Sequence, residues 1–300
     1  MLVFLTGASG WIGSALVPEL LGAGHRVLGL ARSDASIEAV AALGADVHRG
    51  SLDDLESLRS GAAAADAVVH LGYNHDFSRM EDAARTDRDA IAAFGGVLEG
   101  SGRPLVIAAG VAGLATGRPA TERDVPDPDV HPRAASEPAA LAWAERDVRA
   151  MVVRFPPTVH GPGDHGFVAS LVDIARATGT SGYVGEGANR WSAVHRLDAA
   201  RLVRLALEGA PAGSVLHGIA DEGVPTRAIA EALGRGLDLP VESVPTSRAS
   251  EHFDWLGRFF GADLPASSTL TRERLGWQPT QPGLLADLEA DSYFRAPADR

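Results

Sequence analysis

The 300-residue sequence contains no cysteine and no lysine. The absence of cysteine excludes disulfides, thiolate nucleophiles and zinc–thiolate sites. The absence of lysine excludes Schiff-base chemistry and the phosphate-binding P-loop that depends on its Lys. All 27 basic residues are therefore arginine. Tyrosine is also scarce and occurs only as Tyr73, Tyr183 and Tyr293.

Long apolar runs and an excess of positive charge are missing as well. No run approaches the roughly 20 residues of a transmembrane helix, and the N-terminal MLVFLTGASG lacks a basic segment, so it predicts a first strand and not a signal peptide. The net charge of -12 argues against a nucleic-acid partner, because such binding needs Lys and Arg to neutralise phosphates. The histidines lack metal-binding spacing. We therefore expect a cytoplasmic protein with no metal, membrane or nucleic-acid partner.

Short apolar runs alternate with amphipathic segments through the first half of the chain. The runs of strand length lie at 2–6, 26–31, 46–49, 67–73, 104–110 and 151–155. The helical patterns lie at 11–21, 36–43, 53–60, 80–98 and 136–147. This alternation predicts βαβ units with parallel pairing and right-handed crossovers. The expected fold class is α/β, with a Rossmann-type doubly wound parallel sheet.

The second half of the chain has a more mixed pattern. Residues 113–132 and 156–166 are rich in Pro, Gly and Asp or His and predict loops. The first of these predicted loops is longer than most connections without secondary structure. Loops of this length are usually functional or disordered. Further helices are expected at 167–177, 226–237, 254–260 and 284–290, a strand that runs into a helix at 191–209, and a strand at 215–220.

The segment TGASGWIG places Gly7, Gly10 and Gly13 between the first strand and the first helix. In this context the spacing indicates a dinucleotide-binding loop. Gly7 permits the tight turn, Gly10 lets the backbone approach a pyrophosphate, and Gly13 allows close helix–strand packing. The helix N-terminus then offers N–H groups to the phosphates. The alternative is a plain glycine-rich turn.

The end of the second strand bears on the choice of cofactor. An acidic residue there binds the ribose 2′-hydroxyl of NAD, whereas an arginine accommodates the 2′-phosphate of NADP. This chain has Arg32 and Ser33 first, and Asp34 comes later. The order favours NADP (NADPH) over NAD. The alternative is that Arg32 is a solvated surface charge.

Five segments occur in an order that resembles one enzyme family: TGASGWIG, DAVVHLGY, RFPPTVHGPGD, AVHRLDAARL and LTRERLGWQP. The resemblance is to the extended and atypical short-chain dehydrogenases/reductases, also called the NAD-dependent epimerase/dehydratase group, and it covers nearly the whole chain. It implies a dinucleotide-binding domain of residues 1–162, to which 191–220 return. It also implies a small C-terminal α/β substrate-binding domain of residues 163–190 and 221–300, and a homodimer through helices near 80–100 and 136–148.

The resemblance carries the cofactor site over to individual residues. The pyrophosphate loop, the strand ends beside the cofactor and the loop that seats the nicotinamide correspond to Gly7, Ser9, Gly10, Trp11, Ile12, Gly13, Leu71, Gly72, Tyr73, Ala108, Ala109, Gly110, Pro156, Pro157, Thr158 and Val159. Family members often contact the adenine through an Asp. This chain has Ser51 there, followed by Leu52, so the contact is expected to be weaker or to come from the backbone.

The family's usual acid and base are missing. Its chemistry uses a Tyr-x-x-x-Lys pair and an orienting Ser, but in HPRAASEPAAL the Tyr position holds Arg133 and the Lys position holds Glu137. The Ser is also absent, because the fifth strand ends in Ala-Ala-Gly. Arg133 cannot act as an acid, yet it can bind an oxyanion or carboxylate; the alternative is a surface role. For Glu137 a structural role at the helix start is favoured.

His75, in GYNHDFSR, is the leading candidate for moving a proton, because histidine titrates near neutral pH. Tyr73 is the second candidate, and a pocket-shaping role is the alternative for His75. If this segment is helical, His75 and Arg79 share a face. His160 and His195 are more readily explained as structural. The residues expected to bind substrate are Asn74, Arg79, Gly110 and His165.

These observations favour an NADP-dependent oxidoreductase that transfers a hydride to or from a small organic carbonyl, enone or imine. This last step rests on fold-level analogy. Two alternatives stay open. The vacant catalytic positions favour a non-catalytic NADP-binding redox sensor, and a lyase or epimerase that retains its cofactor is the third.

Overall fold

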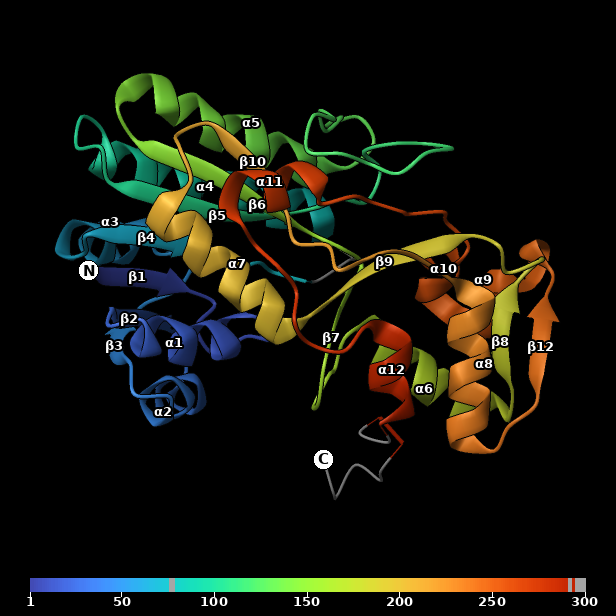
Figure 1. Ribbon diagram of the computed structural model, residues 1–300. Coiled ribbons are helices and arrows are strands. Elements are labelled where there is room, and N and C mark those ends of the chain that lie inside the picture. The colour runs from blue at the N-terminus through green and yellow to red at the C-terminus, as the bar shows by residue number, and fades with distance from the viewer. Residues whose placement is uncertain (76–78, 291–292, 295–300) are drawn as a thin grey trace.

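The computed structural model describes residues 1–75, 79–290 and 293–294. Its centre is a seven-stranded sheet in the order β10-β6-β5-β4-β1-β2-β3, and all neighbouring strands are parallel. The strands are β1 (Leu2–Thr6), β2 (Arg26–Ala31), β3 (Asp46–Arg49), β4 (Ala67–His70), β5 (Pro104–Gly110), β6 (Arg149–Phe155) and β10 (Ser214–His217). Helices cover both faces (Figure 1), which confirms the predicted doubly wound α/β class.

The apolar runs form strands because both faces of the sheet are buried. Successive side chains of β1 therefore enter opposite cores. Val3 and Leu5 join the core under α1 and α7, whereas Phe4 joins the core under α3, α4 and α5. The helices are α1 (Gly13–Gly22), α2 (Asp34–Ala42), α3 (Leu55–Ala64), α4 (Met80–Leu98), α5 (Ser136–Leu141) and α7 (Arg196–Gly209).

A second apolar core, which contains Trp191, Phe253 and Phe260, lies in the C-terminal part of the molecule (Figure 1). Two small sheets, ordered β11-β9-β7 and β12-β8, contribute to this part. Their strands are β7 (Thr158–His160), β8 (Ser181–Val184), β9 (Arg190–His195), β11 (Asp221–Pro225) and β12 (Val241–Val244). The helices here are α6 (Phe167–Thr178), α8 (Thr226–Leu237), α9 (Ala249–Phe253), α10 (Gly257–Phe260) and α12 (Leu284–Glu289). The division into two domains at the predicted boundaries stays a prediction.

Helix caps correct two of the predicted helix starts. α2 begins at Asp34 because the Ser33 side chain accepts a hydrogen bond from the third backbone N–H of the helix. α3 begins at Leu55 because Asp54 caps it in the same way. The helix predicted at 136–147 is two segments: α5 is followed by a 3₁₀ segment, Ala142–Arg146, after which Asp147 has a φ of 55°.

The largest differences from the predicted elements lie in the C-terminal half. β7 lies inside the predicted loop of residues 156–166, and the prediction lacks β8, β11, β12 and α11 (Thr269–Leu275). These strands have three to five residues each, which is too few for a clear alternation of apolar and polar positions. α11 lies against β10 and α7, and it returns the chain to the large sheet.

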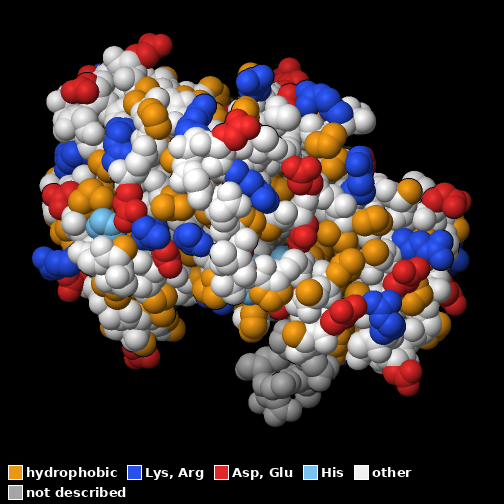
Figure 2. All heavy atoms as spheres, viewed as in Figure 1, with side chains coloured by type: hydrophobic (Ala, Val, Ile, Leu, Met, Phe, Trp, Pro, Cys, Tyr) orange, Lys and Arg blue, Asp and Glu red, His pale blue; other side chains and the backbone are white. Residues whose placement is uncertain are grey.

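Acidic and basic side chains are interspersed on the face shown in Figure 2. No helix among the described residues is long and apolar enough to cross a membrane. Within the same residues, no three His, Asp or Glu side chains are grouped so as to hold a metal ion.

Candidate active site

The glycine loop between β1 and α1 has the shape that a pyrophosphate requires. Gly7 has a φ of 71°, and a Cβ on it would lie 2.8 Å from the backbone nitrogen of Gly72. A Cβ on Gly13 would lie 2.0 Å from the carbonyl oxygen of Gly7. Both positions therefore need glycine. The backbone N–H groups of Ser14 and Ala15 are bonded to the carbonyl oxygens of Gly10 and Ile12. Within the described structure, the N–H groups of Trp11, Ile12 and Gly13 donate no hydrogen bond, so they stay available to an anion.

The adenosine end of the predicted site lies where β2 and β3 end side by side. Arg32 is exposed directly after β2, and within the described chain no hydrogen bond or ion pair engages its side chain. Arg49, the last residue of β3, binds Asp34 through Nη2 and Oδ1 at 3.2 Å. Asp34 therefore has a cationic partner of its own. The other residues predicted to contact the adenosine follow the same two strands: Ser33, Ser51 and Leu52.

A buried polar chain lies beneath the ends of β1 and β4. The hydroxyl of Thr6 accepts a hydrogen bond from the N–H of Gly72 at 3.0 Å and lies 2.7 Å from Nδ1 of His70. Nε2 of His70 lies 3.2 Å from Oδ1 of Asp87, which is on α4. The second carboxylate oxygen of Asp87 is buried without a hydrogen-bond partner and lies 3.9 Å from Nε of Arg133. Thr6, His70 and Asp87 thus connect the glycine loop to Arg133.

Asp87 is charged despite its burial. Burial by itself raises the pKa of this carboxyl, but the hydrogen bond with His70 and the charge of Arg133 outweigh burial and lower the pKa below its usual value. The carboxylate therefore faces Arg133 as an anion. It holds the guanidinium by charge without a direct hydrogen bond, since Nε of Arg133 is also buried and unpaired in the described structure.

Arg133 lies between the ends of β4 and β5, where the resemblance expects the family's Tyr. Its Nη2 donates a hydrogen bond to the carbonyl oxygen of Ala108 at 3.0 Å. Its guanidinium carbon lies 3.8 Å from the centre of the Tyr73 ring, which is a cation–π contact. The structure therefore brings Arg133 and Tyr73 together at the strand ends predicted to flank the nicotinamide.

His75 belongs to the same cluster. Its ring contacts Tyr73 edge to face, with centroids 5.3 Å apart. Partial loss of hydration and the positive charge of Arg133 lower the pKa of His75. Burial raises the pKa of Tyr73, so its hydroxyl keeps its proton at neutral pH. The structure thus brings the two candidate acids and the arginine into one group, and their catalytic roles stay a prediction.

The predicted substrate-binding residues are less closely grouped. His165 is exposed and contacts the Trp11 ring edge to face at 5.3 Å, whereas Arg79 binds Asp82 in the first turn of α4 at 2.8 Å. The helical face that would join Arg79 to His75 is not formed, because His75 is non-helical and α4 begins only at Met80. Residues 76–78 lie outside the described residues. Asn74 is exposed beside His75, and Gly110 ends β5. Substrate binding by these two residues stays a prediction.

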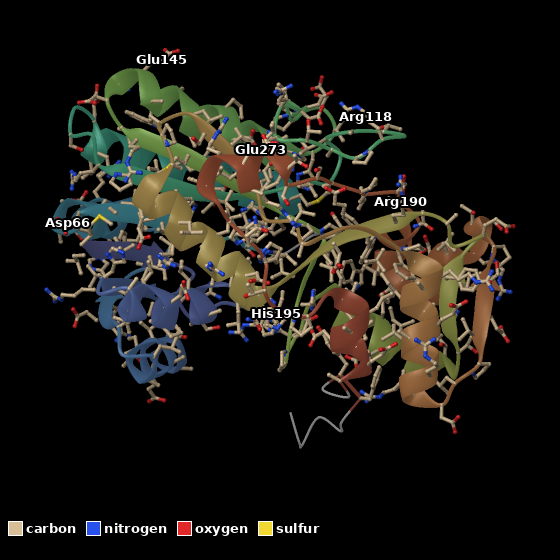
Figure 3. All side chains as sticks on the ribbon, viewed as in Figure 1. Asp66, Arg118, Glu145, Arg190, His195 and Glu273 are labelled. Atoms are coloured by element: carbon tan, nitrogen blue, oxygen red, sulfur yellow. The ribbon has the colours of Figure 1, made fainter. Side chains whose placement is uncertain are left out.

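The loop predicted to seat the nicotinamide is tied to the glycine loop. Nε1 of Trp11 donates a hydrogen bond to the carbonyl oxygen of Val159 at 2.7 Å. His160, fully buried, binds Oδ2 of Asp287 through Nδ1 at 2.8 Å, so it links this loop to α12. The side chain of His195, labelled in Figure 3 where β9 meets α7, caps α7 by accepting the N–H of Leu197 at 3.2 Å.

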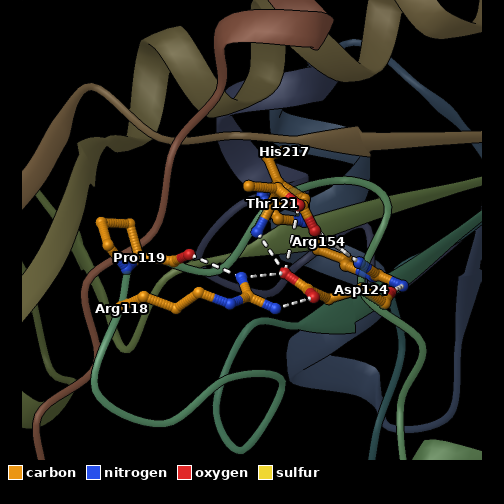
Figure 4. A network of polar contacts seen from close by, with 6 residues as sticks. All are labelled: Arg118, Pro119, Thr121, Asp124, Arg154 and His217. Atoms are coloured by element: carbon orange, nitrogen blue, oxygen red, sulfur yellow. Dashed lines mark hydrogen bonds and ion pairs between the residues drawn. The ribbon is translucent and has the colours of Figure 1, made fainter.

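Glu137, at the position expected for the family's Lys, is buried against β6. Its two carboxylate oxygens accept hydrogen bonds from Nε of Arg154, at 2.8 Å, and from Nη2 of the same residue. Arg154 is completely buried and also donates to the carbonyl oxygens of Asp124 and Thr121. Figure 4 shows Arg154 with Thr121, Asp124 and His217, and the ring of His217 accepts from Nη1 of Arg154 at 3.2 Å. Glu137 is therefore engaged in the core.

Sequence reasoning did not find Asp87, His70 or Arg154. For Arg154 a signal existed, because a single charge inside the apolar strand MVVRF requires a buried partner. The partner itself was not readable, since Glu137 lies 17 residues away in sequence. For His70 and Asp87 no local signal exists, because a lone histidine in a buried strand is as compatible with packing as with function.

Comparison with known proteins identifies the family. The family model described as the NAD dependent epimerase/dehydratase family matches residues 3–216. An uncharacterised protein of Schizosaccharomyces pombe is 46% identical over 296 residues, which covers 98% of this chain and 100% of that protein. A 2-alkyl-3-oxoalkanoate reductase of Stenotrophomonas maltophilia is 29% identical over 73% of this chain and 68% of its own.

Solved structures show the same fold. A dTDP-glucose 4,6-dehydratase of Streptomyces venezuelae, solved with NAD bound, has a TM-score of 0.78 at 21% identity and covers 98% of this chain and 96% of its own. A UDP-glucose 4-epimerase of Thermotoga maritima has a TM-score of 0.78 at 18% identity, with 98% of both chains covered. With the glycine loop and the seven-stranded sheet, these matches show that the chain belongs to the NAD-dependent epimerase/dehydratase family and is an NAD(P)-dependent enzyme of the short-chain dehydrogenase/reductase type.

Proposed function

We propose that the protein is an NADPH-dependent reductase of a small organic carbonyl, enone or imine. The observation that carries this proposal is the position of Arg133, whose guanidinium is held between the ends of β4 and β5 by Ala108, Tyr73 and Asp87. When bound, the cofactor supplies the hydride. The protein then has to stabilise negative charge on the reacting oxygen or nitrogen and to deliver one proton to it.

In this proposal Arg133 stabilises the developing anion and His75 delivers the proton. A guanidinium keeps its charge at all relevant pH values, so Arg133 can donate hydrogen bonds to an oxyanion but cannot protonate it. His75 adjoins Tyr73, which packs against Arg133, and histidine can donate a proton. Tyr73 is the second candidate acid. Asn74, Gly110, His165 and Arg79 remain the proposed substrate contacts.

The preference for NADP is supported by the charges at the ends of β2 and β3. Arg32 is exposed and without an ion pair among the described residues, so its guanidinium can bind a 2′-phosphate. Asp34, the acid that would bind a ribose hydroxyl, is already paired with Arg49. We therefore expect an Arg32→Ala variant to lose affinity for NADPH but not for NADH. Tighter binding of NADH than NADPH by the unchanged protein would overturn this assignment.

The reaction is tested by following NADPH absorbance with a panel of ketones, enones and imines. Arg133→Met should lower kcat by about 10²-fold or more, as loss of an oxyanion-binding donor does in other enzymes, and leave NADPH affinity nearly unchanged. Arg59→Met, an exposed arginine on α3 paired only with Glu56 among described residues, is the matched control. Turnover that survives both His75→Ala and Tyr73→Phe would refute the acid assignment.

The pH dependence offers a second readout. The pKa of His75 lies below its ordinary value of 6.5, so the protonated form is present at low pH and is lost as pH rises through that lowered pKa. The rate of reduction should fall in the same range. Removing the charge of Arg133 should raise the pKa of His75, which NMR of the imidazole can measure. An unchanged pKa in Arg133→Met would contradict the proposed proximity.

A non-catalytic NADP-binding sensor is the second candidate, and one observation favours it. Glu137 occupies the position of the family's Lys and is committed to Arg154 in the core. Tight NADPH binding without turnover across a broad panel would support the sensor and refute the reductase.

A further inference from the structure

Arg196 is the first residue of α7 and lies beside the glycine loop. Its guanidinium carbon is 4.0 Å from the centre of the Trp11 ring. Its Nη2 donates a hydrogen bond to Oγ of Ser14 at 2.9 Å. Ser14 follows Gly13 in the first turn of α1. An arginine from a distant part of the sequence thus stands at the helix N-terminus that is shaped for a pyrophosphate.

The charge of Arg196 has no counter-ion in the described structure. Its Nε is buried and makes no hydrogen bond. Burial lowers the pKa of this guanidinium, and Asp164 is the acid whose charge opposes that effect. The Asp164 carboxylate is itself engaged, because it accepts the N–H of Gly166 at 2.7 Å and the hydroxyl of Tyr293 at 2.9 Å. A partly desolvated arginine with spare donors is costly unless an anion binds it.

Trp11 constrains where the Arg196 guanidinium lies. Its indole N–H donates to the carbonyl oxygen of Val159, so the ring is locked. Arg196 stacks on this ring and reaches the first turn of α1. The spare donors of Arg196 therefore lie in the same region as the N–H groups of Trp11, Ile12 and Gly13, which donate no hydrogen bond in the described structure.

We propose that Arg196 binds the pyrophosphate of the dinucleotide cofactor and supplies a positive charge from outside the glycine loop. The inference rests on the cofactor site of the proposed function, but not on the reaction. It assigns to α7 a direct part in holding the cofactor. It also explains why a positive side chain is retained half-buried at the start of a helix, where the dipole disfavours it.

The test is a set of binding measurements by isothermal titration calorimetry. Arg196→Met keeps much of the apolar stack on Trp11 and removes the charge, and Arg196→Lys keeps the charge. Arg201→Met, one turn further along α7 and bonded to the carbonyl of Gln278 among described residues, is the matched control. The probes are NADP⁺, 2′-phospho-ADP-ribose, which retains the pyrophosphate, and 2′-AMP, which lacks it.

We expect Arg196→Met to weaken NADP⁺ and 2′-phospho-ADP-ribose by about 10-fold to 100-fold, the range for loss of a charge-assisted hydrogen bond. Binding of 2′-AMP should stay within about twofold, and Arg196→Lys should restore part of the affinity. Equal losses for all three probes, or no loss for any, would overturn the inference and leave Arg196 as a structural link between α7 and α1. If Arg196→Met unfolds, the same comparison is made with Arg196→Gln. Failure of the unchanged protein to bind any probe would instead refute the cofactor site itself.

Discussion

Replacing Glu137 by Gln should destabilise the protein strongly without weakening cofactor binding. Arg154 is 0% exposed and Glu137 4% exposed. The substitution leaves a buried guanidinium whose remaining acceptors are neutral: the carbonyl oxygens of Asp124 and Thr121 and a ring nitrogen of His217. Removing one partner of a buried ion pair costs about 3–5 kcal/mol. Because Gln keeps one acceptor oxygen, we expect about 3 kcal/mol.

That loss corresponds to a fall in Tm of about 6–12 °C, at roughly 2–4 °C per kcal/mol. Differential scanning calorimetry measures this fall in Tm. The control is Glu145→Gln, at an exposed position near the end of the same helical region, and its stability should change by no more than about 0.5 kcal/mol. Glu137→Lys, which introduces the family's residue, should be worse than Glu137→Gln because it places a cation against Arg154. If Glu137→Lys folds normally and tightens NADPH binding, Glu137 faces the cofactor and the reasoning is wrong.

Two further predictions concern stability and the glycine loop. Burial lowers the pKa of His217 to about 4. Protonation of this residue at low pH therefore favours the unfolded state, and the free energy of unfolding should fall by about 3 kcal/mol between pH 6.5 and 4. His217→Gln should reduce that loss in acid denaturation curves, and parallel curves for the two proteins would contradict this. Gly13→Ala should abolish cofactor binding, because its Cβ would lie 2.0 Å from the carbonyl oxygen of Gly7. The control is Gly22→Ala in the same helix, which should bind normally because a Cβ there meets no atom within 4 Å. Binding by Gly13→Ala would show that the loop is not the pyrophosphate site.

The large sheet could be predicted from the sequence because its strands are buried on both faces. Such strands are continuous apolar runs, and β1, β2 and β5 are found at the residues that the pattern indicates. The bounds of α4 and α8 also agree with the prediction, since both are long amphipathic helices. The short strands of the C-terminal part could not be predicted, because three to five residues do not establish a period.

In the candidate site, too, the features set by neighbouring residues could be predicted from the sequence, and those set by distant residues could not. The glycine loop is readable because its three glycines lie within seven residues of chain, from Gly7 to Gly13. The chain from Thr6 to His70 and on to Asp87 is not readable, because its contacts span 64 and 17 residues. Arg196 is a further example, since 182 residues separate it from Ser14. Only folding brings these side chains to one place.

The two charges at the entrance of α5 have different consequences for how this enzyme can change. Arg133 faces the strand ends and is supported by Asp87, so its guanidinium is available to a ligand. Glu137 faces the core and is bound by Arg154. A Lys at position 137 would meet a buried cation, so the Tyr-x-x-x-Lys pair of the family cannot be restored by changing these two positions alone. Arg154 would have to become neutral at the same time, and its carbonyl partners would need new donors. On the alignment that the resemblance implies, a return to the family's pair would therefore have to change the core as well as the site, and this agrees with the roles proposed for Arg133 and His75.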